Sequence, residues 1–335
     1  MPIRELTLDE LVTAVRGPAA AAPWAAWPQP GVLVVDLDTG HVPDPVPVAH
    51  GGVRAVVVGR TASGPPEAHP AAPICDVVVT AGDPALDAVA ATVASTPLAA
   101  CALAILLRGS PPGSLDAGLT AESAVYSALQ AGPEFARWRA ARPRRRRAPE
   151  GEAVALARDG ERLHVTLTRP HVRNALDTAM RDRLVDAFAL AAVDGSITEV
   201  HLRGDGPDFC AGGDLDEFGT FPDPATAHLV RLQQSVGRAI AAVAERVTAH
   251  LHGACIGSGI ELPAFAGTVV ADESTVVGLP EVSLGLVPGA GGTVSLPRRI
   301  GRHCTARLAL TGERIDARTA LAWGLVDAVH DTSLR

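Results

Sequence analysis

The sequence of 335 residues contains no lysine, and all 29 residues in the lysine-plus-arginine class are arginines. Schiff-base chemistry on a lysine amine is therefore excluded, and arginine is the only side-chain cation left for a phosphate ligand. Cysteine is also scarce. The five cysteines are odd in number, and no two of them form a C-x-x-C pair. We therefore predict neither a disulfide framework nor a metal site, and we expect a reducing, cytoplasmic location.

Long apolar runs are missing as well. The longest, residues 98–107, is about half of what a bilayer span requires, and residues 1–30 show no basic start followed by an apolar core. A formal net charge of −8 gives no overall attraction to nucleic acid or to an anionic membrane. No strand leads into G-x-G-x-x-G, which argues against dinucleotide binding. We expect neither nucleic acid nor a membrane as a partner.

The composition favours a globular α/β protein, since 47% of the residues are hydrophobic and 20% are charged. Residues 1–30 are expected to form an N-terminal arm with one amphipathic helix at 6–15. Residues 31–142 follow as a strand and helix segment, with strands predicted at 32–37, 53–58 and 77–80 and helices at 83–95, 97–108, 117–131 and 133–142. Arginine, proline and glycine then mark residues 143–152 as a linker.

Residues 153–335 begin a new alternation of strands and helices, which indicates stacked βαβ units. The predicted strands are 163–168, 199–203, 247–251 and 268–271, and the predicted helices are 174–192, 229–244 and 259–265. Asn174 is the expected N-cap of the first of these helices.

Four local patterns in this second segment draw attention to chemistry. The first, Arg-Pro-His-Val-Arg-Asn-Ala-Leu at 169–176, ends a strand and by itself fits an ordinary strand-to-helix turn. The second, Phe-Cys-Ala-Gly-Gly-Asp-Leu at 209–215, has paired glycines that let a ligand approach bare backbone, although a plain glycine turn would look the same.

The third pattern is Gly-Ala-Cys-Ile-Gly-Ser-Gly-Ile-Glu-Leu at 253–262, where a glycine-rich stretch opens a helix. Free N–H groups at such a helix start stabilise negative charge, but tight packing of a helix on a strand would also need these glycines. The fourth spans 279–293 and places Glu281 in an apolar run that ends in Pro-Gly-Ala-Gly-Gly-Thr. A carboxylate among apolar neighbours is costly without a partner, so this pattern favours a functional site.

Taken together and in this order, the four patterns resemble the crotonase (enoyl-CoA hydratase/isomerase) family over about residues 160–330, including Thr311-Gly312 and the Trp-Gly-Leu-Val run at 323–326. The resemblance implies a crotonase-like core of ββα repeats. It also implies an oxyanion hole formed by the backbone N–H groups of Gly213 and Ser258. Serine departs from the glycine that often stands at that position, but only the amide is needed.

The resemblance further implies an acyl-CoA substrate, with coenzyme A entering as the thioester and no separate cofactor. Glu261 would activate water for attack at the β-carbon, and Glu281 would deliver the α-proton, as in family members that hydrate 2-enoyl-CoA. Left open are an enoyl-CoA isomerase, a biosynthetic crotonase acting on an unusual acyl group, and a catalytically silent assembly partner. Taken alone, Glu261 could also serve as a partner of the helix dipole.

Further residues are assigned to the substrate through the same resemblance. They are expected to bind the CoA ester: Arg169, Arg173, Ala175, Ala211, Asp214, Gly257 and Gly289. Related enzymes often carry a lysine just after the second glycine motif, where this chain has Asp216 and Glu217. The CoA phosphates are then expected to meet arginines, either Arg169 and Arg173 or those at 137–147. The family also suggests a homotrimer or a dimer of trimers.

Residues 83–142 resemble the helices that normally follow the Trp-Gly-Leu-Val region in crotonases, including Gly-Leu-Thr-Ala-Glu at 118–122. A permuted order would let these helices replace the family's usual C-terminal helices and pack on the 151–335 core. An unrelated helical domain is the alternative.

Overall fold

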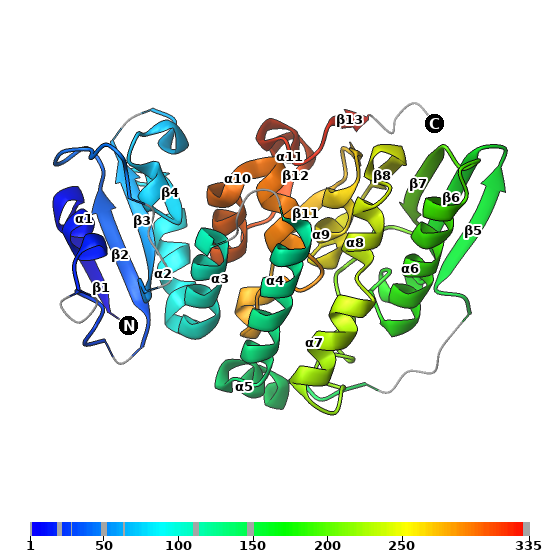
Figure 1. Ribbon diagram of the computed structural model, residues 1–335, viewed down its shortest axis with the longest axis horizontal. Coiled ribbons are helices and arrows are strands. Elements are labelled where there is room, and N and C mark those ends of the chain that lie inside the picture. Colours follow the sequence, from blue (N-terminus) through cyan, green and yellow to red (C-terminus); the bar gives the residue numbers. More distant parts are fainter. Residues whose placement is uncertain are drawn as a thin grey trace.

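The structure is a computed structural model that describes residues 2–18, 22–27, 29–47, 52–62, 64–109, 114–145 and 151–330. Part of the predicted linker, residues 146–150, lies outside the described residues. Figure 1 shows the chain running from an N-terminal sheet, through a group of helices, into a second set of sheets. The predicted α/β class is confirmed.

The N-terminal sheet has four parallel strands in the order β1 (Ile3–Thr7), β2 (Gly31–Asp36), β3 (Ala55–Thr61) and β4 (Val77–Thr80). The last three correspond to the predicted strands, whereas β1 was not foreseen. It is an edge strand with only Leu6 buried, so its sequence carries little apolar signal. Helix α1 (Leu8–Arg16) follows directly because Thr7 and Glu10 form a capping box, which places the start of the predicted 6–15 helix at Leu8.

The four predicted helices between 83 and 142 are confirmed as α2 (Ala85–Ser95), α3 (Pro97–Gly109), α4 (Leu115–Gln130) and α5 (Pro133–Ala141). Helix α3 is fixed to the N-terminal sheet through Arg108, whose Nε lies 2.7 Å from Oδ1 of Asp76. Its first N–H groups are capped by Glu134 of α5, which accepts from Leu98 at 2.8 Å and Ala99 at 3.0 Å. Partners of this kind satisfy helix-end donors that burial would otherwise leave empty.

The second part of the chain builds two sheets. The larger has the order β13 (Ala328–His330), β10 (Thr268–Asp272), β8 (Val247–Leu251), β7 (Glu199–Gly204), β6 (Arg162–Leu167) and β5 (Val154–Asp159). All neighbours run parallel except β5 and β6. The smaller sheet joins β12 (Ile315–Asp316), β11 (Val276–Gly278) and β9 (Ala254–Ile256).

Three predicted helices differ from the structure, and the first differs at its start. Helix α6 (Thr178–Val193) is capped by Asp177, which accepts from the Met180 N–H, and not by Asn174. Asn174 is fully buried at φ 52°, and its side chain donates to two loop carbonyls, of Asp205 and Asp208. A short polar side chain tolerates this left-handed backbone better than most, so Asn174 supports the turn instead of starting the helix.

The helix predicted at 229–244 is also broken. The chain forms α7 (Pro224–Gln233) and then α8 (Val236–Ala241), because Ser235 caps a new helix by accepting from the Arg238 N–H. The predicted 259–265 helix is reduced to the single turn α9 (Ser258–Glu261) and a 3-10 turn that Pro263 begins. Two C-terminal helices complete the set, α10 (Gly292–Thr311) and α11 (Ala317–Trp323).

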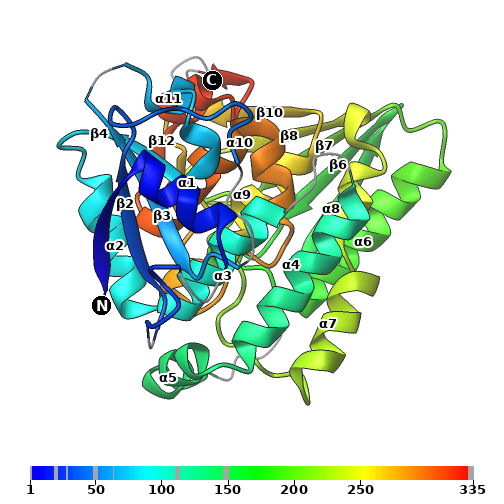
Figure 2. The ribbon, with the colours of Figure 1, turned by 60° about the vertical axis from the view of Figure 1, so that its left-hand side comes forward.

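Helices α2, α3 and α4 pack against α10, and α4 also lies along α7 (Figure 2). One buried apolar cluster runs from Val56 and Val58 of β3, through Leu103 of α3, to Leu308 of α10. The approach at α4 is tight, since a Cβ on Gly118 would lie 2.8 Å from a methyl carbon of Val294. The expected packing of the helices on the 151–335 core is therefore present, while the permuted origin stays a hypothesis.

No single helix in the described part of the chain is long and apolar enough to cross a membrane. Helices α2 and α3 pass that test only as a pair, and they are bent by 117° where they meet.

Candidate active site

A cavity of about 190 Å³ opens where α4, α7 and α9 meet the turns at 213–219 and 289–291. It brings together both predicted catalytic residues, Glu261 and Glu281, and both predicted oxyanion residues, Gly213 and Ser258. The four come from three different stretches of the second segment, so the fold, not sequence proximity, assembles them.

The oxyanion residues end two turns that lie side by side. Cys210 and Cys255 pair as an isolated bridge, and Gly257 takes φ 53°, which brings Ser258 to the start of α9. A helix start leaves its first N–H without an intrahelical acceptor. Among the described residues, no hydrogen bond occupies the N–H of Gly213 or of Ser258. Both amides are therefore available to an oxygen inside the cavity.

Glu261 closes the short helix α9 and is buried. Its Oε2 accepts from the N–H of Ala290 at 2.8 Å and of Gly292 at 2.9 Å. Burial raises the pKa of Glu261 to about 7, and the N–H donors of the 289–292 turn partly offset that rise. A carboxyl group with such a pKa exchanges a proton readily near neutral pH.

Glu281 is also buried, and it faces the oxyanion turn. A Cβ on Gly257 would lie 2.3 Å from its Oε1, so only glycine fits beside this carboxyl group. Its Oε2 is buried without a hydrogen-bond partner in the described structure. Burial, and then the neighbouring Glu261, raise the pKa of Glu281 well above its usual range. Both effects favour the protonated form of Glu281, and one of its oxygens is free for a ligand.

A third carboxyl group, Glu122 of α4, enters the same cavity and was not assigned a function from sequence. Its Oε1 accepts from the Gly291 N–H at 2.7 Å, and its Oε2 accepts from the N–H of Thr293 at 2.8 Å and from the Thr293 Oγ1 at 2.7 Å. Burial and the charge of Glu261 raise the pKa of Glu122 to about 8. Glu122 and Glu261 therefore hold the 290–293 turn together, because each accepts hydrogen bonds from different N–H groups of that turn. The sequence signal that could have pointed to Glu122 is an acid beside the apolar positions of the predicted 117–131 helix.

Comparison with known proteins decides the family. The sequence profile described as Enoyl-CoA hydratase/isomerase matches residues 161–333. The chain is 37% identical over 181 residues to the 2,3-dehydroadipyl-CoA hydratase of Escherichia coli, covering 54% of this chain and 70% of that protein. The chain belongs to the enoyl-CoA hydratase/isomerase family.

Solved structures of this family agree with that assignment. The enoyl-CoA hydratase of Thermoplasma volcanium superposes with a TM-score of 0.51 at 35% identity, over 55% of this chain and 73% of that one. A Thermobifida fusca protein provisionally named an enoyl-CoA hydratase, solved in complex with CoA, gives a TM-score of 0.50 at 29% identity, over 54% and 73% of the two chains. This member of the enoyl-CoA hydratase/isomerase family is therefore a crotonase-fold enzyme.

The residues predicted to bind the CoA ester divide into two groups. Asp214 and Gly289 line the cavity, whereas five are not among its lining residues: Arg169, Arg173, Ala175, Ala211 and Gly257. The second group holds the turns in place: the Ala211 N–H donates to the Arg173 carbonyl at 2.9 Å, and the Ala175 carbonyl accepts from Arg169. Contact of either group with CoA stays a prediction.

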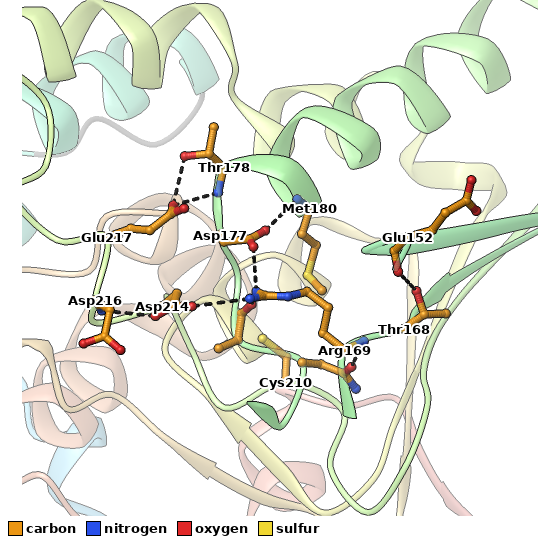
Figure 3. A network of polar contacts seen from close by, with 12 residues as sticks. Glu152, Thr168, Arg169, Asp177, Thr178, Met180, Cys210, Asp214, Asp216 and Glu217 are labelled. Atoms are coloured by element: carbon orange, nitrogen blue, oxygen red, sulfur yellow. Dashed lines mark hydrogen bonds and ion pairs between the residues drawn. The ribbon is translucent and has the colours of Figure 1, made fainter. Parts of the chain in front are cut away.

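Arg169 and Arg173, the two arginines predicted to bind the CoA ester, already form ion pairs with aspartates of the protein. Figure 3 shows the Arg169 guanidinium between Asp177 and Asp214, at 3.0 Å and 3.5 Å respectively. Arg173 forms a forked pair with Asp208, at 2.6 Å and 3.1 Å. The same view shows Glu217 accepting from the N–H and hydroxyl of Thr178, which fixes the start of α6.

Arginines of the predicted 137–147 set lie beside the loop that carries the lysine in related enzymes. Arg139 donates to the Leu215 carbonyl at 2.7 Å, and Arg144 donates to the Phe218 carbonyl at 3.2 Å. Burial and the nearby charges of Arg144 and Arg142 lower the pKa of Arg139. Cations crowded in this way, paired mainly with neutral carbonyls, favour a phosphate ligand.

No group of three or more His, Cys, Asp or Glu side chains could hold a metal ion within the ranges that the structure describes. The five cysteines are free thiols in the structure.

We expect Glu122→Ala to damage both stability and turnover in this family member. The change leaves the Gly291 N–H and both Thr293 donors without an acceptor, at a cost of about 1–3 kcal/mol for each buried group. The freed turn also carries the N–H groups that hold Glu261, so kcat should fall by roughly tenfold or more. Thermal denaturation and steady-state kinetics measure the two effects. Glu122→Gln keeps one acceptor oxygen and should lie between; equal melting temperatures for Glu122→Ala and the parent would contradict the anchoring role.

Proposed function

We propose that the protein hydrates a 2-enoyl-CoA to the 3-hydroxyacyl-CoA. The observation that carries the proposal is one cavity that holds two unoccupied backbone N–H groups together with Glu261 and Glu281 in different environments. The names of the family relatives support acyl-CoA processing.

The oxyanion pair acts on the thioester. As water attacks the β-carbon, electron density moves through the double bond onto the thioester oxygen, and the N–H groups of Gly213 and Ser258 stabilise that charge. Removing one such donor typically costs about 3 kcal/mol of transition-state stabilisation. Because backbone supplies the donors, the side chain of Ser258 need not take part.

The two glutamates move the protons. Glu261 takes a proton from water through the oxygen that the 290–292 turn leaves unbound, and the hydroxyl group bonds to the β-carbon. Glu281 gives its proton to the α-carbon, which collapses the enolate back to a thioester. Glu261 then releases its proton and Glu281 takes one up, through solvent or directly, which restores the starting state, so the net reaction adds one water across the double bond.

The pH dependence follows from these opposite requirements. Glu261 must be ionised and Glu281 must be protonated, so kcat/KM for crotonyl-CoA should rise as the pH increases through about 7, the raised pKa of Glu261. It should fall where Glu281 ionises, and the raised pKa of Glu281 moves that descending limb upward from the usual carboxyl range. A pH–rate profile measures both limbs. A profile that is flat from about pH 5 to 8 would contradict the assignment of Glu261 as base.

Isomerisation is the competing reaction on the same site, because moving a double bond needs the oxyanion hole and one proton-transfer group. Hydration of crotonyl-CoA, followed as loss of the conjugated thioester absorbance, is measured beside double-bond migration in a 3-enoyl-CoA. Faster migration than hydration would replace the hydratase proposal with an isomerase, and inactivity on both would favour a silent assembly partner.

We also propose that the arginines at 139–145 meet the CoA phosphates and that the protein assembles as a homotrimer. The first rests on the guanidinium groups beside the 215–219 loop, and the second rests on family membership alone. Sedimentation analysis of the purified protein tests the oligomeric state.

A further inference from the structure

Arg231 of α7 lines the same cavity as Glu261 and Glu281, and its surroundings are unusual. Its Nε donates to the Ser123 Oγ at 3.1 Å, and its Nη2 donates to the Ser123 carbonyl at 3.4 Å and to the Ser127 hydroxyl. Its guanidinium lies over the ring of Tyr126, 4.5 Å from the centroid. Every one of these partners is neutral.

Several enclosed arginines in the described part of the chain are paired with carboxylates, whereas Arg302, which lies outside the cavity lining, donates to the carbonyls of Pro73 and Cys75. Arg108 pairs with Asp76, Arg169 with Asp177, and Arg307 with Asp83. Arg181, the other arginine on the cavity wall, pairs with Asp182. No carboxylate lies within ion-pair distance of Arg231 among the described residues, and its Nη1 makes no hydrogen bond there.

A partly buried cation without a counter-ion is costly, because water is removed and no opposite charge replaces it. Arginine cannot escape that cost by losing its proton at ordinary pH. Ser123, Ser127 and Tyr126 fix the plane of the guanidinium, which pre-organises the N–H groups of Nη1 for a charge-assisted hydrogen bond to an anion. Burial lowers the pKa of Arg231, and Tyr126 and the more distant Glu122 only partly offset that effect.

We propose that Arg231 binds a carboxylate at the far end of the acyl chain, so that the preferred substrates are CoA thioesters of dicarboxylic acids. This inference rests on the proposed function, which places the thioester between the oxyanion turns and Glu281 in the same cavity. Apolar side chains line the cavity as well, among them Leu119, Leu232 and Val236, which suits a methylene chain between two polar ends. The E. coli relative carries the name of a hydratase for such an acyl group.

The competing anion is a phosphate of CoA itself. Adipoyl-CoA and hexanoyl-CoA separate the two cases, since they share the CoA moiety and the chain length and differ only in the terminal carboxylate. Both are saturated, so they bind without being hydrated.

The test measures the dissociation constants of both thioesters by calorimetry, for the parent protein, Arg231→Gln and the control Arg238→Gln. Arg238 lies on α8 outside the cavity lining and pairs with Asp116 at 2.7 Å. We expect the parent to prefer adipoyl-CoA by at least about tenfold, Arg231→Gln to lose that preference, and Arg238→Gln to keep it. Equal affinity of the parent for the two thioesters overturns the proposal, and so does an equal loss for both in Arg231→Gln, which would place a CoA phosphate on Arg231.

A second readout separates this inference from the hydratase proposal. Hydration rates are measured with the matching 2-enoyl thioesters, one with and one without the terminal carboxylate, and the ratio of kcat/KM values is compared between Arg231→Gln and Arg238→Gln. A binding preference that depends on Arg231, without hydration of either thioester, would overturn the hydratase proposal and leave the carboxylate site standing. Hydration of both thioesters, with the same kcat/KM ratio in all three proteins, would support the hydratase proposal and overturn the carboxylate site.

Discussion

Replacing either Glu261 or Glu281, the two glutamates proposed to be catalytic, with glutamine is expected to lower kcat for hydration of a 2-enoyl-CoA by about 10²–10⁴-fold. Glu261→Gln removes the group proposed to take a proton from water, and Glu281→Gln removes the proposed acid, whose Oε2 has no hydrogen-bond partner among the described residues. Glutamine keeps the shape of each side chain, so binding of a saturated acyl-CoA should change little. Steady-state kinetics and calorimetric binding are the two measurements.

The exposed carboxylate Glu273, which pairs with Arg318 at 2.7 Å, supplies the matched control. Glu273→Gln makes the same chemical change at the surface and should retain full turnover. Both active-site variants should also show normal circular dichroism, because neither change leaves a cavity. A loss below about tenfold in both variants would remove the two glutamates from the mechanism.

Removing the N-terminal segment is expected to have the second large effect. A fragment of residues 151–335 loses α4, and with it the Glu122 carboxylate that holds the Gly291 and Thr293 N–H groups. It also exposes the apolar side of α10, including Val294, which now packs on Gly118. Exposed patches of this kind drive association, so the fragment should aggregate or be inactive.

Expression yield, light scattering and hydration of crotonyl-CoA measure the outcome, with the full chain prepared in parallel. Separately expressed residues 1–150, supplied together with the fragment, should restore solubility if the helices act by covering the core. A soluble fragment with the activity of the full chain would contradict this role and would leave the N-terminal helices as an independent domain.

The sequence was sufficient for the features that depend on local backbone chemistry. Paired glycines before Asp214 and the turn before Glu261 predicted exposed N–H groups, because residues without a Cβ leave the backbone accessible. Glu281 was recognisable because an acid in an apolar run is rarely structural. The helices at 83–142 were also predictable from their caps and apolar periodicity, and the structure confirms all four.

The ends of helices and strands that depend on tertiary contacts were harder to predict from the sequence. Strand β1 forms because β2 supplies a parallel partner, although only one of its side chains is buried. Asn174 has the composition of a helix cap but bonds the carbonyls of Asp205 and Asp208, more than 30 positions along the chain. Local helix propensity contains no information about a hydrogen-bond partner at that separation in sequence.

The sequence alone thus predicted the family, which the comparisons confirm, and it put forward the two glutamates and the two oxyanion amides, because each depends on a short stretch of residues in a fixed order. Only the tertiary structure decided what completes the site. It brought Glu122 to the 290–293 turn across 169 positions of the chain. It matched the charge of Arg169 with two aspartates and left Arg231 facing the cavity among neutral partners. Burial and charge pairing arise from contacts distant in sequence, so residue order does not reveal which arginine remains open to a substrate.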